Sequence, residues 1–352
     1  MMRGSATQNL ASPIHRREDF EMIEEKEGTI TVQNTTAVKE NVFKRACRAV
    51  KKDAKKNWVI YLLTLPALAF FIVFCYFPMV GLIMAFQDFD MAKGFFGSPW
   101  ADNNGLEHFI RFFNDKNFWL YFNNTLIYGL LSLVFVFPAP IVLGLMINSV
   151  KKAWYRRVIL TLVYLPYFIS IVVTCTIINQ LTSNTGVFTE LFRNLGVLKK
   201  DIGIINDPRF FRAIIVISDI WQTIGFNSII YIAALGGIDV SLYEAAEIDG
   251  AGRFNKLWHI SLPSILPTIM MLLIMKVGTM LNVGFEKLYL LKNELNEEVA
   301  YTISVFIYEK GALGTGAWSY TTAIGLFNSV LSFLLLLLAN WVSNKLTANG
   351  IF

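Results

Sequence analysis

The chain of 352 residues is 55% hydrophobic and 16% charged, with a mean hydropathy of +0.49 and a formal net charge of +5. Its apolar residues gather in blocks of about 20 or more, the length that an α-helix needs to cross a hydrocarbon core about 30 Å thick. These features exclude a soluble protein with a large core and predict an integral membrane protein. The small positive charge does not point to a nucleic-acid partner.

Residues 1–57 form a polar segment without the apolar periodicity of a folded core. This composition predicts a mostly disordered cytoplasmic tail, to which we assign no function. A basic collar at 44–56 comes before the first apolar block, and it consists of Lys44, Arg45, Arg48, Lys51, Lys52, Lys55 and Lys56. Anionic headgroups attract such residues by about 1 kcal/mol each, so the collar is expected to lie on the cytoplasmic surface of the lipid bilayer.

Six apolar blocks follow the tail. Each is predicted to be a transmembrane helix, because a segment in lipid must satisfy its own backbone hydrogen bonds. The blocks run over about 58–86, 122–147, 158–181, 211–235, 265–285 and 320–342. Prolines inside or near the block ends are expected to kink or locally open the helices, namely Pro66, Pro78, Pro138, Pro140 and Pro166.

The orientation of the chain follows from its basic residues. A second basic cluster, Lys151, Lys152, Arg156 and Arg157, lies between blocks two and three. An even number of blocks separates it from the collar, so the positive-inside rule places both clusters in the cytoplasm. Both termini are then cytoplasmic, and so is the loop at 237–262 between blocks four and five.

This loop carries the most informative pattern in the chain. Tyr243-Glu-Ala-Ala-Glu-Ile-Asp-Gly-Ala251 is followed by Ile260-Ser-Leu-Pro263. We expect Ser241 and Glu244 to form a capping box at the start of a short helix, and Gly250 to end that helix in the left-handed conformation. Pro263 suits the start of the next helix. A capped helix at the membrane interface would account for Ser241 and Glu244 alone, but not for the whole pattern at its fixed spacing.

Glu-Ala-Ala, three residues, Gly, nine residues and Ile-x-Leu-Pro resembles the coupling loop of permeases of the type I ABC importers. The surrounding sequence is similar to the carbohydrate-uptake branch related to maltose permeases, and within it to the subgroup for oligosaccharides and polysaccharide fragments. Asn123-Asn-Thr-Leu126, Tyr320–Ser329 and Ala339-Asn-Trp341 support this. The resemblance covers 58–352, with a core at 120–342, whereas the long acidic tail departs from the family.

The resemblance implies an all-α fold of six transmembrane helices in the bacterial cytoplasmic membrane. It also implies partners: a second permease, expected to be a homologous but different chain, two ATPase subunits that bind ATP and Mg²⁺, and an extracellular solute-binding lipoprotein. The residues expected to couple this chain to an ATPase are Tyr243, Glu244, Ala245, Ala246, Asp249, Gly250, Ala251, Leu262 and Pro263.

Catalysis by this chain itself is not expected. It contains no Gly-x-x-x-x-Gly-Lys-Ser/Thr loop for phosphates, and its three histidines are dispersed. Cys47, Cys75 and Cys175 are too scattered for a metal site. No apolar block holds a pair of carboxylates for acid–base chemistry. We therefore predict a transport subunit that binds no metal or cofactor.

A saccharide pathway would need aromatic faces with amides or carboxylates that pair with hydroxyl groups. The candidates in blocks four to six are Trp221, Gln222, Asn227, Asn282, Glu286 and Asn328. Amides between helices also serve simply to join them, and the partner permease can hold the sugar site instead. Lys276 within block five is equally compatible with snorkelling, with an internal ion pair and with a pathway role.

Two other readings of the function stay open. The first keeps ATP-driven import but changes the cargo to an amino acid, a peptide or an anion. The second is a membrane enzyme or an ion-coupled carrier, which would need the catalytic carboxylates that the blocks lack. The sequence does not identify the saccharide or the ATPase.

Overall fold

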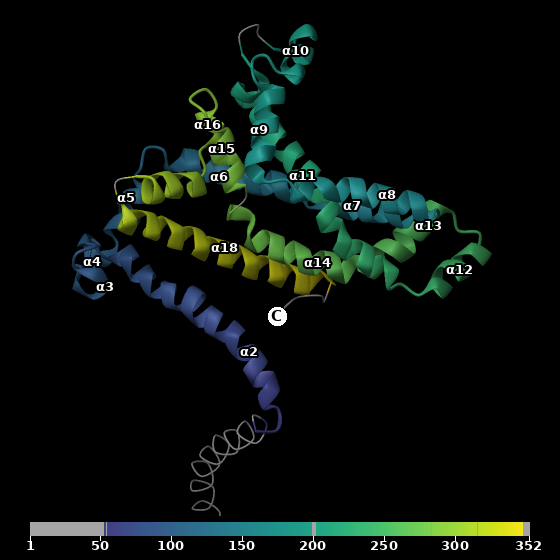
Figure 1. Cartoon of the computed structure of the whole chain (residues 1–352), viewed down its shortest axis with the longest axis horizontal. Helices are drawn as coiled ribbons and strands as arrows, with labels where there is room; N and C mark the ends of the chain where they lie inside the picture. The colour runs from purple at the N-terminus through teal and green to yellow at the C-terminus, as the bar shows by residue number, and fades with distance from the viewer. Residues whose placement is uncertain (1–52, 54, 199–201, 283, 315, 348–352) are drawn as a thin grey trace, which may run out of the picture. The chain divides into compact units, whose positions relative to one another are not determined.

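Figure 1 shows the computed structural model, which describes residues 53, 55–198, 202–282, 284–314 and 316–347. The regular elements of these residues are all helical, apart from one isolated antiparallel bridge between Gln87 and Trp100. Residues 1–52 and 54 of the predicted tail, with the basic collar up to Lys52, fall outside the described residues. The chain divides into two compact units, Met1–Val80 and Gly81–Phe352.

The first unit carries the start of the first span. Helix α2 (Trp58–Phe71) continues through a π-helical turn, η1 (Ile72–Tyr76), into the 3₁₀ segment η2 (Phe77–Phe86). Together they form a 29-residue helical stretch in which an 18-residue window has a mean hydropathy of 2.4, as predicted for block one. Pro66 lies inside α2 without ending it.

The second unit contains the remaining elements. Its first half comprises α3 (Gly94–Gly97), α4 (Asp102–Gly105), α5 (Glu107–Phe113), α6 (Phe118–Leu131), η3 (Ser132–Val136), α7 (Pro138–Asn148), α8 (Ala153–Tyr164), η4 (Leu165–Phe168), α9 (Ile171–Thr182), α10 (Val187–Asn194) and η5 (Ile204–Asn206). Its second half comprises α11 (Pro208–Gly236), α12 (Val240–Ile248), α13 (Arg253–Lys256), η6 (Leu257–Ser261), α14 (Leu262–Gly278), η7 (Met280–Asn282), α15 (Phe285–Leu291), α16 (Glu297–Ala300), α17 (Ile303–Ile307), η8 (Tyr308–Ala312) and α18 (Trp318–Thr347).

Five helical stretches of the described chain are long and apolar enough to cross a membrane, and they correspond to blocks one, two, four, five and six. Their bounds are Trp58–Phe86, Phe118–Asn148, Pro208–Gly236, Arg253–Gly278 and Trp318–Lys345. The predicted extension of block five to residue 285 is wrong, because α14 ends at Gly278 and Gly284 has a φ of +66°. A left-handed residue interrupts a right-handed helix.

The kink predicted at Pro166 in block three is confirmed, and it divides the block into two helical segments. The segments Ala153–Phe168 and Ile171–Asn194 meet at an angle of 97°, so the block is a broken span or a re-entrant loop. Pro166 cannot donate a backbone hydrogen bond, and Ile169 and Ser170 are extended. Gln222 of α11 donates its side-chain amide to the carbonyl of Ile169 at 3.2 Å, which satisfies the backbone at the break.

Prolines open the helices in one recurring way. Phe77, Phe137 and Leu262 each donate their N–H to the carbonyl five residues earlier, and each comes directly before a proline. The proline lacks an N–H and its ring crowds the preceding turn, so the helix widens by one residue instead of breaking. The predicted local opening is confirmed at Pro78 and Pro138, and the same device occurs at Pro263.

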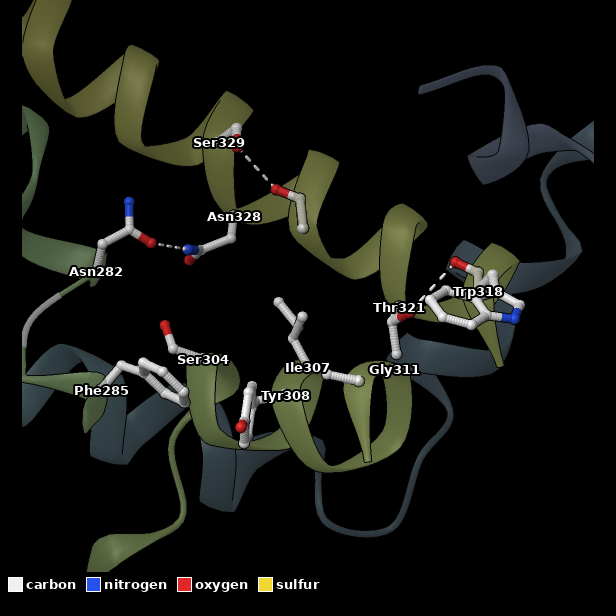
Figure 2. A pocket seen from close by; sticks show the side chains of 12 residues that line it. Asn282, Phe285, Ser304, Ile307, Tyr308, Gly311, Trp318, Thr321, Asn328 and Ser329 are labelled. Atoms are coloured by element: carbon white, nitrogen blue, oxygen red, sulfur yellow. Dashed lines mark hydrogen bonds between the residues drawn. The ribbon is translucent and has the colours of Figure 1, made fainter. Parts of the chain in front are cut away.

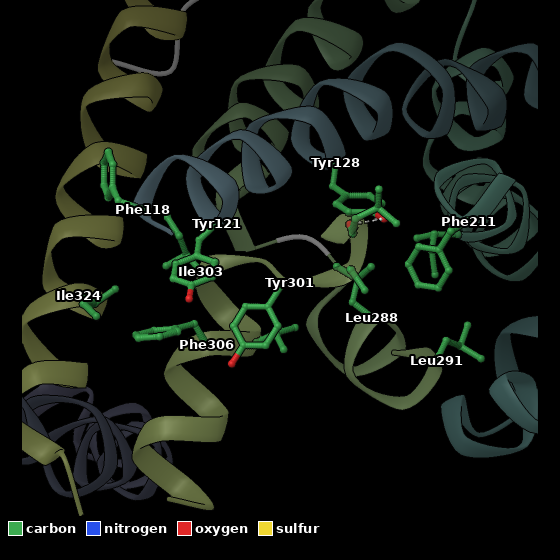
Figure 3. Packing of buried hydrophobic residues seen from close by; sticks show 14 of the residues in the cluster. Phe118, Tyr121, Tyr128, Phe211, Leu288, Leu291, Tyr301, Ile303, Phe306 and Ile324 are labelled. Carbon is green, nitrogen blue, oxygen red and sulfur yellow. Dashed lines mark hydrogen bonds between the residues drawn. The ribbon is translucent and has the colours of Figure 1, made fainter. Parts of the chain in front are cut away.

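The larger core lies where α6, α11, α15, α17 and α18 meet (Figure 3). Tyr121 stacks on Phe306 with ring centroids 4.8 Å apart. Beside it, the amide of Asn124 donates to the carbonyls of Glu298 and Tyr301 at 2.8 and 3.0 Å, and Thr125 accepts the N–H of Ile303 at 3.0 Å. The polar residues at the start of block two therefore hold the irregular segment that contains α16.

Helix α11 is central to the bundle, because it packs against α7, α8 and α14, while α14 lies along α18 (Figure 1). A second core cluster, Ile141, Tyr231, Leu235 and Ile265, joins α7, α11 and α14. The closest approach is at Gly225, where an added Cβ would lie 2.1 Å from the backbone oxygen of Val163 in α8. Only glycine fits there without moving a backbone.

We expect Gly225→Ala to lower the thermal midpoint of the purified protein in detergent, with an overpacking cost of about 1–3 kcal/mol or more. The matched control is Gly236→Ala, at the end of the same helix, where an added Cβ meets no atom within 4 Å. Alanine is the better helix former by about 1 kcal/mol, so the control should match or exceed the unmodified protein. Equal midpoints for the two variants would contradict the close approach of α11 and α8.

Candidate functional site

The loop predicted to be functional contains a short helix, α12, with a defined cap at its N-terminus. Asp239 is the N-cap residue, and its carboxylate accepts the N–H of Ser241 at 2.9 Å. The predicted capping box of Ser241 and Glu244 is therefore wrong, because the helix begins at Val240 and places Ser241 inside its first turn. An aspartate caps as well as a serine, and Asp239 comes two residues earlier in the chain.

The predicted end of α12 is confirmed. Gly250 has a φ of +74°. Its N–H is bonded to the carbonyl of Glu247 at 3.1 Å, and the N–H of Ala251 is bonded to the carbonyl of Ala246 at 2.8 Å. This pair of bonds is a Schellman motif, which satisfies the last carbonyls of the helix and reverses the chain.

The returning arm, α13 and η6, runs without interruption into α14 and is tied to α12 in two places. Lys256 Nζ lies 2.6 Å from Glu247 Oε1, and the Tyr243 hydroxyl lies 2.9 Å from the Ser261 hydroxyl. The hydrogen bond and the charge of Lys256 lower the pKa of Glu247. The loop is thus a braced unit that extends from the ends of α11 and α14 (Figure 1).

Much of the loop at 237–262, called the α12 loop from here on, is exposed. Glu244, Ala245, Asp249 and Gly250 lie on its surface, whereas Tyr243, Ala246, Ala251 and Leu262 are half-buried and Pro263 is exposed. The exposed fraction is 88% for Ile248 and 76% for Phe254, which flank the Gly250 turn. Large apolar side chains at this exposure on a rigid helix and turn form a surface suited to another protein.

Two of the predicted pathway residues meet. The amide of Asn328 in α18 donates to Asn282 Oδ1 at 2.8 Å, and both residues line a cavity of about 620 Å³ between α18 and the α17–η8 segment (Figure 2). Phe285, Tyr308 and Trp318 contribute aromatic walls to the same cavity. Asn328 Oδ1 is buried and has no hydrogen-bond partner among the described residues.

Two smaller cavities continue from this one in sequence, each sharing lining residues with the one before it. Asn282 also lines a cavity of about 320 Å³ that includes Asp219, Asn227 and Lys276. Asn227 and Lys276 recur in a cavity of about 280 Å³ between α7, α11 and α14. Asn227, Asn282 and Asn328 are therefore distributed along one series of neighbouring cavities.

The other three predicted pathway residues do not line these cavities. Gln222 is committed to the carbonyl of Ile169 and, at 3.4 Å, to the hydroxyl of Thr174, so its contacts serve the break in block three. Trp221 and Glu286 are exposed on the surfaces of α11 and α15.

Comparison with known proteins places this architecture. Residues 137–348 match the family described as the binding-protein-dependent transport system inner membrane component. The chain belongs to this family. It is therefore a multi-pass membrane transport permease.

This permease is 42% identical to Protein LplB of Bacillus subtilis over 86% of this chain and 93% of that protein. It is 40% identical to the polygalacturonan/rhamnogalacturonan transport system permease protein YteP of Bacillus subtilis, over 86% and 95% of the two chains. A solved bacterial ABC transporter involved in the import of the acidic polysaccharide alginate contains a chain that matches with 39% identity and a TM-score of 0.76. That match covers 85% of the permease and 99% of the solved chain, which confirms the predicted all-helical ABC permease fold.

Sequence reasoning missed one charged residue of the permease. Lys287 in α15 is 2% exposed, and its Nζ lies 2.5 Å from Asp219 Oδ1 in α11. A buried charge is retained only with a partner, so Asp219 within block four is the signal in the sequence that indicates a nearby cation. Lys287 sits directly after Glu286 in Phe-Glu-Lys-Leu, and only the fold shows that Lys287 is the buried member.

Acid should loosen the α12 loop of the permease. The N–H of Ser241 lowers the pKa of Asp239, and Lys256 lowers that of Glu247, so both carboxylates stabilise the folded loop when charged. This stabilisation is complete above the ordinary pKa values of 3.8 and 4.5, and it is lost as the pH falls through the lowered ones. Hydrogen exchange of 239–250, corrected for intrinsic rates, should become faster between about pH 6 and about pH 3.

Asp239→Asn with Glu247→Gln is the control for this prediction. Asparagine still caps a helix but does not titrate, so the double variant should lose most of the dependence on pH. If the amide hydrogens of the unmodified loop exchanged equally fast at both pH values, the contacts of the charged Asp239 and Glu247 would not stabilise the loop.

Proposed function

We propose that this chain is a membrane-spanning subunit of an ATP-driven importer of oligosaccharides or polysaccharide fragments in the bacterial cytoplasmic membrane. The observation that carries the proposal is the α12 loop, a braced and exposed helix with the Glu-Ala-Ala pattern, in a chain of the binding-protein-dependent transport family. The saccharide cargo is supported by the relatives, one named for polygalacturonan and rhamnogalacturonan transport and one for alginate import.

In this proposal α12 is the coupling helix. Two separate ATPase subunits bind ATP and Mg²⁺, and one of them receives Ile248, Phe254 and the Glu244–Gly250 surface in a cleft. This chain then needs no cofactor of its own. A homologous second permease completes the pathway, and an extracellular solute-binding lipoprotein delivers the saccharide. The solved alginate transporter was also obtained in complex with a pentasaccharide-bound periplasmic protein, which supports this last partner.

The bracing of the loop provides the mechanical link. Because Glu247 is paired with Lys256 and Tyr243 with Ser261, a displacement of α12 would draw on the segment that leads into α14. Closure of the ATPase subunits would push the loop as a unit and rock α14 with the helix packed along it, α18. ATP would thereby bias the bundle between two packings, one open to each side of the membrane.

The coupling surface can be tested with Ile248→Ser and Phe254→Ser. Each large side chain that an ATPase buries contributes about 1.5–3 kcal/mol, so each variant should weaken co-purification of the ATPase and ATP-driven uptake about tenfold or more. The matched control is Phe96→Ser in α3, which removes an aromatic residue that is 89% exposed outside this loop. Loss of ATPase in the Phe96 variant, or none in the other two, would refute the assignment.

The transport activity can be tested by reconstituting the chain with its ATPase, its partner permease and its binding protein in vesicles. Saccharides should accumulate only with ATP on the ATPase side. Gly250→Pro should abolish uptake and leave membrane insertion intact, because proline cannot adopt the left-handed turn. If this chain without its partners took up solute driven by an ion gradient, it would be an ion-coupled carrier instead. If the complete importer took up amino acids or peptides but no saccharide, the proposed cargo would be wrong.

A further inference from the structure

A lysine lies in the middle of the cavity series. Lys276 is half-buried in the last turn of α14 and lines both the 320 Å³ and the 280 Å³ cavities. The first of these cavities shares Asn282 with the 620 Å³ cavity beside α18. A solute that moves along the series therefore passes Lys276. An ionisable side chain inside a membrane-spanning segment is costly to keep, so it marks a functional position by default.

The charge of Lys276 is not balanced by a partner of its own. No ion pair or hydrogen bond joins its ammonium group to another residue in the described part of the chain. Asp219 supplies the one carboxylate in the described lining of the two cavities, and it lies 2.5 Å from the buried Lys287. The pair Asp219–Lys287 is neutral as a unit, whereas Lys276 leaves one positive charge facing the cavities.

The rest of the lining suits a sugar chain. Asn227 and Asn282 offer amides, and Ser132, Thr223 and Thr279 offer hydroxyl groups, within the same 320 Å³ cavity. Amides and hydroxyls both donate and accept hydrogen bonds, as sugar hydroxyls require. A neutral saccharide would leave the ammonium group unpaired. A carboxylate would pair with it in a charge-assisted hydrogen bond, which is about twice as strong as a neutral one.

The number of charges distinguishes between anions. A phosphate group carries a charge of about −1.5 to −2 near neutral pH, whereas a sugar carboxylate carries a single charge. Lys276 neutralises one carboxylate completely, whereas a phosphate would keep a negative charge of about −0.5 to −1 in the cavity, where an uncompensated charge is costly. The cavity therefore favours a uronic-acid residue over a sugar phosphate.

We propose that Lys276, with Asn227 and Asn282, forms a subsite in the translocation path that binds the carboxylate of an acidic, uronate-containing oligosaccharide. This inference rests on the proposed function, because it names the class of saccharide that the same pathway carries. Lys276 is the residue that selects acidic from neutral chains. Beside it, Lys287 already binds Asp219, the one carboxylate in the described lining.

The test uses the complete importer in vesicles with ATP and its binding protein. The probes are short oligogalacturonates and oligoalginates, each compared with its fully methyl-esterified form, which has the same skeleton without the charge. Lys276→Met removes the charge at similar length, Lys276→Arg keeps the charge, and Lys345→Met removes an exposed lysine at the far end of α18. Basal ATP hydrolysis and co-purification of the ATPase report on assembly.

We expect Lys276→Met to reduce uptake of the acids about tenfold or more relative to uptake of the esters, the scale of one hydrogen bond to a charged group. Lys276→Arg and Lys345→Met should keep the ratio of the unmodified importer. The same binding protein serves every variant, so its own preference cancels when variants are compared.

Several results would overturn the inference. If the unmodified importer carried acids but Lys276→Met reduced acids and esters equally, the subsite would be refuted and the proposed function would stand. If the importer carried only neutral saccharides or only sugar phosphates, the acidic cargo would be refuted and saccharide import would stand. If it carried no saccharide, the proposed function and this inference would both fail.

Discussion

A backbone group in hydrocarbon has no water to bond with, and this constraint determines where the helices of the permease bend. At Pro78, Pro138 and Pro263 the preceding N–H reaches back five residues, and the helix continues as a widened turn. After α8 there is no such widened turn, and the segments Ala153–Phe168 and Ile171–Asn194 meet at 97°. The break is stabilised from outside by α11, because Gln222 bonds the carbonyl of Ile169 and Gly225, one turn on, lets the two backbones touch. The face of α11 that carries Gln222 and Gly225 therefore stabilises the broken span.

The α12 loop follows the opposite rule, because α12 lies outside the apolar spans and side chains join it to the returning arm. Asp239 begins the helix, the Gly250 turn ends it, and two side-chain contacts close the hairpin on itself. A flexible loop would absorb a push from a partner, whereas a loop braced in this way would pass it on to α14 if it is the coupling element that we propose. Its apolar residues are then free to face outward, which explains why Ile248 and Phe254 are exposed on an otherwise well-bonded segment.

Local signals predicted those parts of the fold that local chemistry determines. Apolar length gave five of the spans, and the left-handed Gly250 followed from its place after a helical run. The rest depends on partners distant in sequence. Gln222 was expected in a sugar pathway, but the carbonyl it bonds is 53 positions away, and the role of Asn124 depends on carbonyls more than 170 positions away. The predicted start of α12 lies two residues too late, with Ser241 as the N-cap in place of Asp239. The sequence pattern alone does not locate a helix start to within two residues. The coupling and pathway roles stay predictions.

The polar residues inside the bundle separate into two groups with different consequences. Asn124, Thr125 and Tyr128 each bond a backbone group of the α16–α17 segment, so their polarity is used up by the fold. In the other group, Asn328 Oδ1 on α18 is buried beside the 620 Å³ cavity without a hydrogen-bond partner among the described residues, and Lys276 faces its cavities without a counter-ion of its own. A buried unpaired acceptor costs about 1–3 kcal/mol, and folding alone would favour apolar replacements at these positions. Their retention along the cavities is explained if the missing partner is a solute that arrives and leaves, since a permanent protein partner would close the path that the solute must travel.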